Sequence, residues 1–359
     1  MIQTKVTFQN QLNKDFHDTL KSRVKEYFEK NNLSIHADSK MITKTIVLLT
    51  GLLVTYLSIL NPLTSLWIDW LLCIVLGFFI AGIGFSIAHD AIHQSYSSNK
   101  TINNLLSLTM NLIGGNAYVW SITHNIVHHT YTNINDHDED LELAPFIRLS
   151  KHQEYRKIHR WQHYFAFIAY GFATFFWVHI KDFKKISQKN IGPYKNKKHP
   201  AREIILLITS KLLYYTYIIV IPLMVLPITW WQFLIGYLTM HLTSGIILGV
   251  VFQLAHTVEN TEHPLANEQH KMPDSWAVHQ MRTTNNFGMN NKILNWYIGG
   301  LNFQIEHHLF PHICSTHYKK ISPIIQQTAR EFDVPYYHHN TFREAVASHF
   351  RYLKLLSNP

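Results

Sequence analysis

The sequence predicts an all-α integral membrane protein, with four transmembrane helices in two hairpins, one interfacial helix and a cytoplasmic helical cap. Three observations predict this class: uncharged stretches of membrane-spanning length, an uneven distribution of Lys and Arg, and histidine clusters near the ends of those stretches. Only 15% of the 359 residues are charged and 47% are hydrophobic. An ordinary soluble domain has roughly 25% charged residues. The composition also excludes a disordered chain, which needs high charge and few aromatic residues.

Five apolar stretches are long enough to consider as membrane helices: residues 45–60, 70–88, 164–178, 212–228 and 233–255. A membrane-spanning helix needs about 20 mostly apolar residues. Asn61 and Pro62 separate the first two stretches, which we expect to form one hairpin, and the last two form the second. The stretch 164–178 is the shortest, and we expect it to lie in the membrane interface.

Positive charge predicts which side of the membrane each segment occupies. Residues 1–44 and the loop 181–202 each contain eight Lys and Arg, whereas the turns 61–65 and 229–232 contain none. We therefore place both termini and the 181–202 loop in the cytoplasm, in a multi-pass protein of the cell membrane if the source is bacterial. In the alternative topology, 164–178 crosses the membrane and another stretch does not.

Three regions follow from these assignments. Residues 1–40 are polar, carry no signal-peptide pattern, and form a predicted cytoplasmic amphipathic helix with Phe16, Leu20 and Val24 on one face. Residues 41–320 form the membrane domain with its cytoplasmic cap. Residues 321–359 form a cytoplasmic carboxy-terminal helical segment.

Histidine is unusually frequent, because its 25 residues outnumber the 23 carboxylates. The sequence has three clusters and one further histidine at the end of an apolar stretch: His89 and His93 in HDAIH, His124, His128 and His129 in HNIVHH, His307 and His308 in QIEHH, and His256. Residues three or four apart share one face of a helix, so each cluster can direct imidazoles at one point. In the predicted topology all four groups lie on the cytoplasmic face. A solitary histidine elsewhere is interpreted as a surface, interfacial or hydrogen-bonded residue.

Imidazole is a common metal ligand and suits iron, copper and zinc. Eight histidines exceed the ligands of one ion and predict a site for two. No Glu is followed by His three residues later, and HExxH is absent, which excludes the Glu-x-x-His di-iron signature and the zincin signature. The two cysteines, Cys73 and Cys314, cannot form a disulfide framework.

With these motifs the sequence resembles the membrane fatty-acid desaturases over residues 40–320. The resemblance rests on HDAIHQSYS, WSITHNIVHHTYTN, WAVHQMRTTNNF and GGLNFQIEHHLFPHI, which stand in the family's order. It implies two iron ions bound by the seven histidines of the three clusters, with His256 as the extra ligand. The reaction that it implies uses molecular oxygen and two electrons to insert a cis double bond into an acyl-CoA or acyl-lipid chain.

Gln304 opens the third cluster where many members have histidine. It resembles the front-end subgroup, which acts between an existing double bond and the carboxyl end, but related bacterial desaturases share it. No HPGG motif of a fused cytochrome b5 domain is present. The resemblance therefore implies a separate electron donor, such as ferredoxin or cytochrome b5 with its reductase.

Other residues are candidates for extra metal ligands or for residues that hydrogen-bond to the ligands and orient them. They are Gln304, His279, His312, Asp90, Asn125, Glu306 and the acidic run Asp136 to Glu142. The acidic run is equally well explained as a solvated loop. Tyr118, Trp120 and Trp161 are candidates for the mouth of an apolar acyl tunnel, although aromatic residues at an interface need no such role.

The basic cytoplasmic surface has three interpretations: membrane topology alone, attraction of anionic lipid, or docking of CoA phosphates and an acidic electron donor. No nucleic-acid-binding module is present. Two alternative functions remain: a lipid hydroxylase with the same site, and a histidine-rich membrane metal transporter or haem protein. A transporter would place its ligands in mid-membrane on broken helices.

Overall fold

The computed structural model describes residues 6–141, 146–195 and 198–359, and these residues are mostly helical. Four helical rods are long and apolar enough to cross a membrane: Ser39–Ile59, Leu66–Ile92, Ala201–Val225 and Trp230–His256. Lys157–Gly171 and Ala173–Ser187 form a further apolar pair, bent by 57°. The described residues therefore contain four helices that could cross a membrane, or up to five if the bent pair is one span.

The amino-terminal part contains α1 (Lys14–Lys30), α2 (Ser39–Ile59), α3 (Leu66–Ile83), α4 (His89–Ile92), α5 (Lys100–Leu112), α6 (Ala117–Trp120) and α7 (His129–Tyr131). The middle part contains α8 (Gln162–Gly171), α9 (Ala173–Phe176), α10 (Asp182–Ser187), α11 (Ala201–Tyr215), α12 (Ile221–Val225) and α13 (Trp230–His256). The carboxy-terminal part contains α14 (Trp276–Thr283), α15 (Lys292–Tyr297), α16 (Gln304–Leu309), α17 (Tyr318–Glu331) and α18 (Phe342–Leu355).

Shorter elements complete the described chain. Four π-helical segments are η1 (Gly84–Ala88), η2 (Ser121–His128), η5 (Trp177–Lys181) and η6 (Thr216–Val220). Three 3₁₀ turns are η3 (Glu139–Leu141), η4 (Lys157–Trp161) and η7 (Ser315–His317). β1 (Asn190–Ile191) pairs antiparallel with β2 (Tyr194–Lys195), and β3 (Asn286–Phe287) pairs parallel with β4 (His338–His339). These two small ladders are a minor departure from the all-α prediction.

The membrane-capable helices begin earlier than the hydropathy pattern predicts. The rod expected at 45–60 begins at Ser39, and the rod expected at 212–228 begins at Ala201. In both cases a buried lysine lies inside the helix. Lys211 donates to Asp182 at 2.7 Å and to two backbone carbonyls, and Lys44 lies over the Trp296 ring. Because these ammonium groups have partners within the protein, the helices tolerate charge that a sequence window counts against them.

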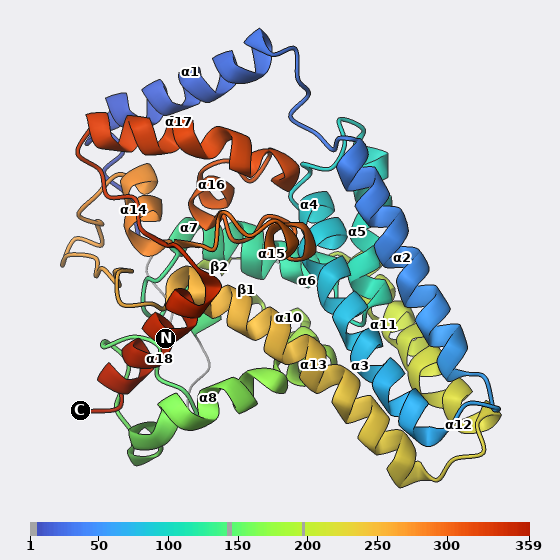
Figure 1. The fold of residues 1–359 in the computed structure, drawn as a ribbon. Helices are drawn as coiled ribbons and strands as arrows, with labels where there is room; N and C mark the ends of the chain where they lie inside the picture. The colour runs from blue at the N-terminus through green and yellow to red at the C-terminus, as the bar shows by residue number, and fades with distance from the viewer. Residues whose placement is uncertain (1–5, 142–145, 196–197) are drawn as a thin grey trace.

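Helix α13 is the central helix and packs against α3, α8 and α9, while α2 packs against α3. Small residues permit these close contacts. A Cβ atom on Gly245 would lie 2.1 Å from the Gly171 carbonyl oxygen, and one on Gly77 would lie 2.6 Å from the Met240 carbonyl oxygen. Figure 1 shows α3 and α13 both rising from the lower right of the molecule toward the centre, where the short histidine-bearing helices lie.

Helices α1 and α17 form an outer layer over those short helices (Figure 1). Phe16, Leu20, Val24 and Phe28 are the buried residues of α1, and they pack with α17 and the segment around α16. Within residues 1–40, α1 therefore buries one apolar face against the rest of the protein. Its apolar face covers the element that carries His307 and His308.

Candidate metal centre

Eight imidazoles from separate parts of the chain meet in one buried region. His89 and His93 come from α4 and its end, His124 and His128 from η2, His129 from α7, His256 from α13, and His307 and His308 from α16. Their rings lie at most 6% exposed, apart from the half-buried His93. The three sequence clusters and His256 are thus brought together.

The nitrogen atoms fall into two groups. His89, His93, His124 and His307 form one group, and His128, His256 and His308 form the other. Within each group one nitrogen per ring lies within 4.8 Å of every other. His129 lies between the groups, because its ring centroid is 4.5 Å from that of His307 and 4.3 Å from that of His308.

The second cluster departs from the expected helical spacing. Its helix is π-helical from Ser121 to His128, a form that occurs frequently at functional sites. The wider turn brings together residues five apart, so that the Nε2 atoms of His124 and His129 lie 3.2 Å apart. Two nitrogens that share one ion at about 2.1 Å each lie at roughly this separation.

Each of the eight rings has a buried nitrogen without a hydrogen-bond partner. Among the residues that the structure describes, no hydrogen bond reaches the buried Nε2 atoms of His89, His93, His128, His256, His307 and His308, nor the Nδ1 atoms of His124 and His129, whose Nε2 atoms face each other. A buried polar atom without a partner is costly. The six unpartnered Nε2 atoms and the facing pair of His124 and His129 fit a set of metal ligands, because a bound cation would satisfy them together.

The opposite nitrogen of several rings is held by the protein. Asp138 accepts from His128 Nδ1 at 3.1 Å, Gln280 Oε1 accepts from His308 Nδ1 at 2.8 Å, and Tyr318 Oη lies 3.1 Å from His307 Nδ1. His256 Nδ1 lies 3.2 Å from the Thr283 carbonyl. Such contacts fix the ring orientation and the tautomer that leaves Nε2 free for a metal.

Asp90 connects the first cluster to the chain that follows the third. One carboxylate oxygen accepts from the Ser315 amide at 3.0 Å, the Ser315 hydroxyl at 2.8 Å and the Cys314 thiol at 3.2 Å. The other oxygen lies 3.4 Å from His89 Nδ1. Asp90 is buried, so it fixes α4 relative to α16 through several hydrogen bonds.

Burial keeps most of these rings in the neutral form that binds metals. It lowers the pKa of His93, His124, His129, His307 and His308, and the neighbouring imidazoles lower it further. His128 differs. Burial also acts to lower its pKa, but the Asp138 carboxylate outweighs burial, and the net pKa is raised.

The remaining candidate residues surround the cluster at different distances. Asn125 donates to the Ile92 carbonyl at 3.0 Å and joins the first two clusters, while Gln304 donates to the Leu301 carbonyl at 2.8 Å. His279 contacts the Thr132 carbonyl through Nε2 at 2.8 Å. Exposed His312 lies on the outer surface. None of these four is brought into the groups of nitrogen ligands formed by the described residues.

The acidic residues have distinct environments. Glu306 is fully buried and accepts from Asn286 and Tyr336 at 2.7 Å each, and burial raises its pKa. Within the acidic run, Asp138 contacts His128 directly, and Asp140 lies 3.6 Å from the same ring nitrogen. Glu142 lies outside the described residues. At Asp138 and Asp140 the run is part of the centre and not a solvated loop.

Of the three aromatic candidates, only Trp120 contacts the clustered histidines among the described residues. Trp120 stacks on His124 at 4.1 Å and contacts His89 and His93 edge-on. Tyr118 instead contacts His199, and Trp161 is 58% exposed. The sequence did not single out Gln280, Tyr318 or Thr283, although Gln280 lies within the quoted stretch WAVHQMRTTNNF.

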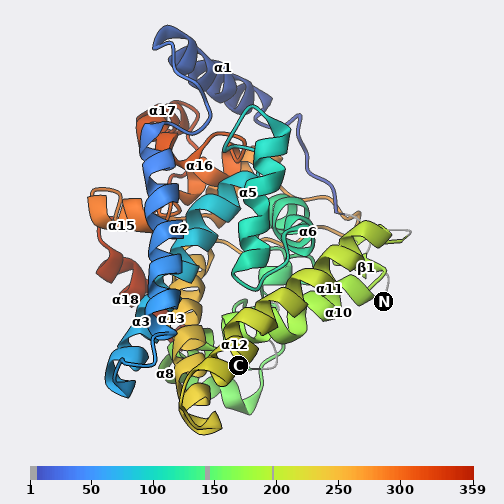
Figure 2. The same cartoon turned by 90° about the vertical axis from the view of Figure 1, so that its right-hand side faces the viewer.

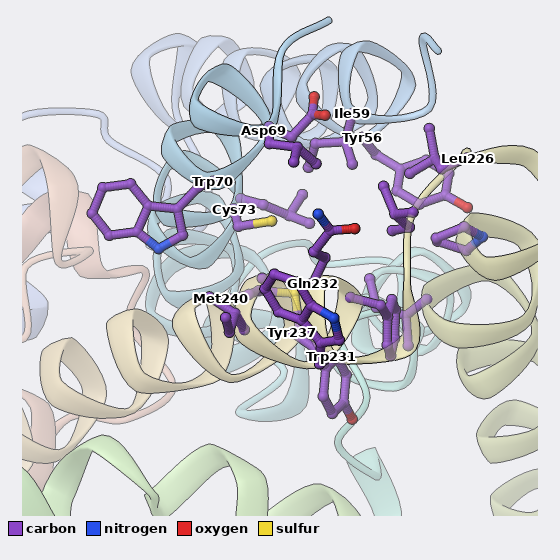
Figure 3. Close-up of a pocket in the computed structure, with 18 of the residues that line it drawn as sticks. Tyr56, Ile59, Asp69, Trp70, Cys73, Leu226, Trp231, Gln232, Tyr237 and Met240 are labelled. Atoms are coloured by element: carbon purple, nitrogen blue, oxygen red, sulfur yellow. The ribbon is translucent and has the colours of Figure 1, made fainter.

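An apolar cavity of about 390 Å³ lies at the other ends of the helices, lined by α2, α3, α12 and α13. Figure 3 shows Gln232 of α13 and Cys73 of α3 pointing toward each other across it. Met240, which also lines it, is 16 residues from His256 along α13, which corresponds to roughly 24 Å. The cavity is therefore separate from the histidine cluster.

Comparison with known proteins supplies the family context. A family model described as fatty acid desaturase matches residues 65–340. The sn-1 linoleoyl-lipid 6-desaturase of Arthrospira platensis is 38% identical over 99% of this chain and 96% of its own length. The enzyme of the same name from Synechocystis sp. is 36% identical, over 95% of each chain. The acyl-lipid (8-3)-desaturase of Physcomitrium patens is 33% identical over 95% of this chain and 72% of its own length.

Proposed function

We propose a specific reaction for this chain, which belongs to the fatty acid desaturase family and is a fatty acyl desaturase, an oxidoreductase. The proposed reaction removes one hydrogen from each of two adjacent methylene groups of a lipid-linked acyl chain. With molecular oxygen, two electrons and two protons as co-reactants, it yields one cis double bond and two waters. The observation that carries the proposal is the set of eight buried imidazole nitrogens without partners.

Two iron ions, bound by His89, His93, His124, His128, His129, His256, His307 and His308, form the proposed cofactor. When bound, they supply the oxygen activation that an unactivated alkyl chain requires and that acid–base side chains cannot provide. The protein's own groups orient the ligands. Asp138, Gln280 and Tyr318 hold ring nitrogens, and Asp90 fixes the first cluster relative to the third.

We infer front-end regioselectivity on an acyl-lipid, with linoleoyl-lipid as the first substrate to test. Two relatives that match nearly the whole chain are named sn-1 linoleoyl-lipid 6-desaturases, and Gln304 has the residue type of that subgroup. The electrons come from a separate protein such as ferredoxin or cytochrome b5 with its reductase. Trp120, stacked on His124, is proposed to border the reacting part of the acyl chain.

The proposed topology places the histidine cluster on the cytoplasmic face, with α2–α3 and α11–α13 as two hairpins. The rods Leu66–Ile92 and Trp230–His256 end at the cluster, which supports one common face. The bent pair Lys157–Gly171 and Ala173–Ser187 is proposed to lie in the interface. Residues 1–40, 41–320 and 321–359 remain the proposed regions, with the outer two joined through α1 and α17.

Expression in a host that lacks polyunsaturated fatty acids tests the reaction. Fed linoleic acid, cells with the parent chain are expected to accumulate an acyl chain two hydrogens lighter, with the new double bond at carbon 6 by derivatisation and mass spectrometry. His307→Ala is the matched control and is expected to yield none. A product heavier by one oxygen would identify a hydroxylase instead, and a double bond toward the methyl end would contradict front-end selectivity.

A further inference from the structure

A basic surface lies directly outside the second histidine cluster, and the catalytic centre does not use it. It is made by Lys184 of α10, Lys189 and Lys195 of the β1–β2 hairpin, and Arg202 of α11, all exposed. Figure 2 shows β1, α10 and the beginning of α11 together at one edge of the molecule. We call these four residues the hairpin surface.

Three carboxylates close to this surface are already paired with lysines, whereas Glu203, which follows Arg202 in the chain, forms no ion pair among the described residues. Glu139 pairs with Lys185, Asp140 with Lys181 at 3.5 Å, and Asp182 with Lys211 at 2.7 Å. Among the described residues, none of the four cations of the hairpin surface forms an ion pair. By contrast, Lys25, Lys30 and Arg23 on α1 each contact a glutamate. The hairpin surface therefore keeps its positive charge available for a partner.

The same surface is in contact with the cluster. Both strands of the hairpin pack on η2, and Ile191 is completely buried. Gly192 lies so close that an added Cβ would be 3.3 Å from Val127 Cγ1, and Val127 precedes His128 in the chain. Lys181, three residues before Lys184 in the chain, lies 3.5 Å from Asp140, which in turn lies 3.6 Å from His128 Nδ1.

We propose that the hairpin surface is the docking site of the acidic one-electron carrier protein that reduces the centre. This inference rests on the proposed function, because that reaction consumes two electrons per double bond. One-electron transfer from each of two reduced carriers oxidises both carriers and balances the reaction. Charge complementarity selects the carrier and accelerates the encounter, while the packing of the hairpin on η2 places the bound carrier next to the ring of His128.

The test compares Lys189→Glu/Lys195→Glu with a matched control, Lys319→Glu/Lys320→Glu, which reverses two exposed lysines of α17. All proteins are reconstituted in nanodiscs of phosphatidylcholine alone, so that anionic lipid is absent. Electrons are supplied by reduced ferredoxin and, in a second arm, by reduced cytochrome b5. For at least one carrier, the hairpin variant is expected to show a KM at least tenfold higher at low salt, whereas the control stays within twofold of the parent.

Ionic strength and chemical reduction make the result specific. Raising the salt should lower the carrier-driven rate of the parent steeply and that of the hairpin variant only slightly. A single turnover after dithionite reduction and oxygen addition should give the same yield in both. Equal carrier KM values in parent and hairpin variant, or a loss confined to the α17 variant, would overturn the proposal. Failure of the parent in the single turnover would instead contradict the proposed function.

Discussion

Two buried groups of histidines in this molecule have opposite hydrogen-bonding patterns. At the cluster, eight imidazoles each present a nitrogen without a partner. In the middle of α13, His241 has contacts at both ring nitrogens: Thr174 Oγ1 lies 3.1 Å from Nδ1, and Tyr214 Oη lies 3.3 Å from Nε2. His179 nearby likewise contacts Tyr215 and Tyr237. Burial alone therefore does not identify a metal ligand, whereas a converging set of unsatisfied nitrogens does.

Removing one imidazole from the cluster should have the largest effect. His128→Ala is expected to reduce desaturation at least 100-fold and to lower the bound iron below two per chain, because one ligand of the second group is lost. Purified protein loaded with iron under reducing conditions, analysed for metal content and for product, provides the measurement. Full activity in this variant, or iron near two per chain, would be incompatible with the proposed ligand set.

Asp138→Asn should have the next largest effect. The amide keeps the size of the side chain, but it removes the carboxylate that holds His128 Nδ1 and can stabilise the wrong tautomer. Loss of a group that hydrogen-bonds to a metal-ligating histidine typically costs about 10- to 100-fold in metal affinity or activity. Competition with a chelator measures the affinity. Asp136→Asn is the matched control within the same acidic run and is expected to change affinity less than twofold.

Tyr318→Phe should have a smaller effect, because it removes a single hydrogen bond to His307 Nδ1 and leaves the ring in place. We expect a loss of about threefold to tenfold in activity, which corresponds to the roughly 1 kcal/mol of one neutral hydrogen bond. Iron content should stay near the parent value. Steady-state rates normalised to bound iron separate this outcome from a loss of metal, and a larger loss than that of Asp138→Asn would reverse the proposed order.

The cluster shows how far the sequence leads and where it stops. Local motifs located seven of the eight histidines, because HDAIH, HNIVHH and QIEHH are readable without any tertiary contact, and His256 was located by its place at the end of an apolar stretch. They did not reveal that His124 approaches His129, since that depends on the π-helical form of η2. Gln280 and Tyr318 were missed because each lies on a different helix from the histidine that it contacts. Contacts between distant segments depend on the packing of the whole fold, which no local pattern encodes.

The helix boundaries teach the same lesson. Hydropathy located four membrane-capable helices but began all of them too late, and it began two of them at residues 45 and 212, directly after Lys44 and Lys211, where the charge of each lysine is compensated. Asp182 and two carbonyls surround Lys211, and the Trp296 ring faces Lys44. Conversely, His241 is a solitary histidine, for which the sequence favours a hydrogen-bonded role, and its 15-residue separation from His256 along α13 is incompatible with a shared site.

His241→Leu should have the smallest effect on the rate of desaturation. It is the most direct test of the difference between the clustered histidines and a histidine whose two ring nitrogens both have partners. It removes one contact of the Tyr214 hydroxyl, which also forms a hydrogen bond with Tyr237, while Thr174 keeps its contacts with the His241 carbonyl and Ser244. Loss of one hydrogen bond costs about 0.5–1.5 kcal/mol, so the detergent-solubilised variant should unfold at a lower temperature than the parent. Iron per folded chain and the rate per bound iron should stay within twofold of the parent values. If His241→Leu lost iron as His128→Ala is expected to, the distinction between satisfied and unsatisfied histidines would fail, because a ring with both nitrogens engaged would then be supporting the metal.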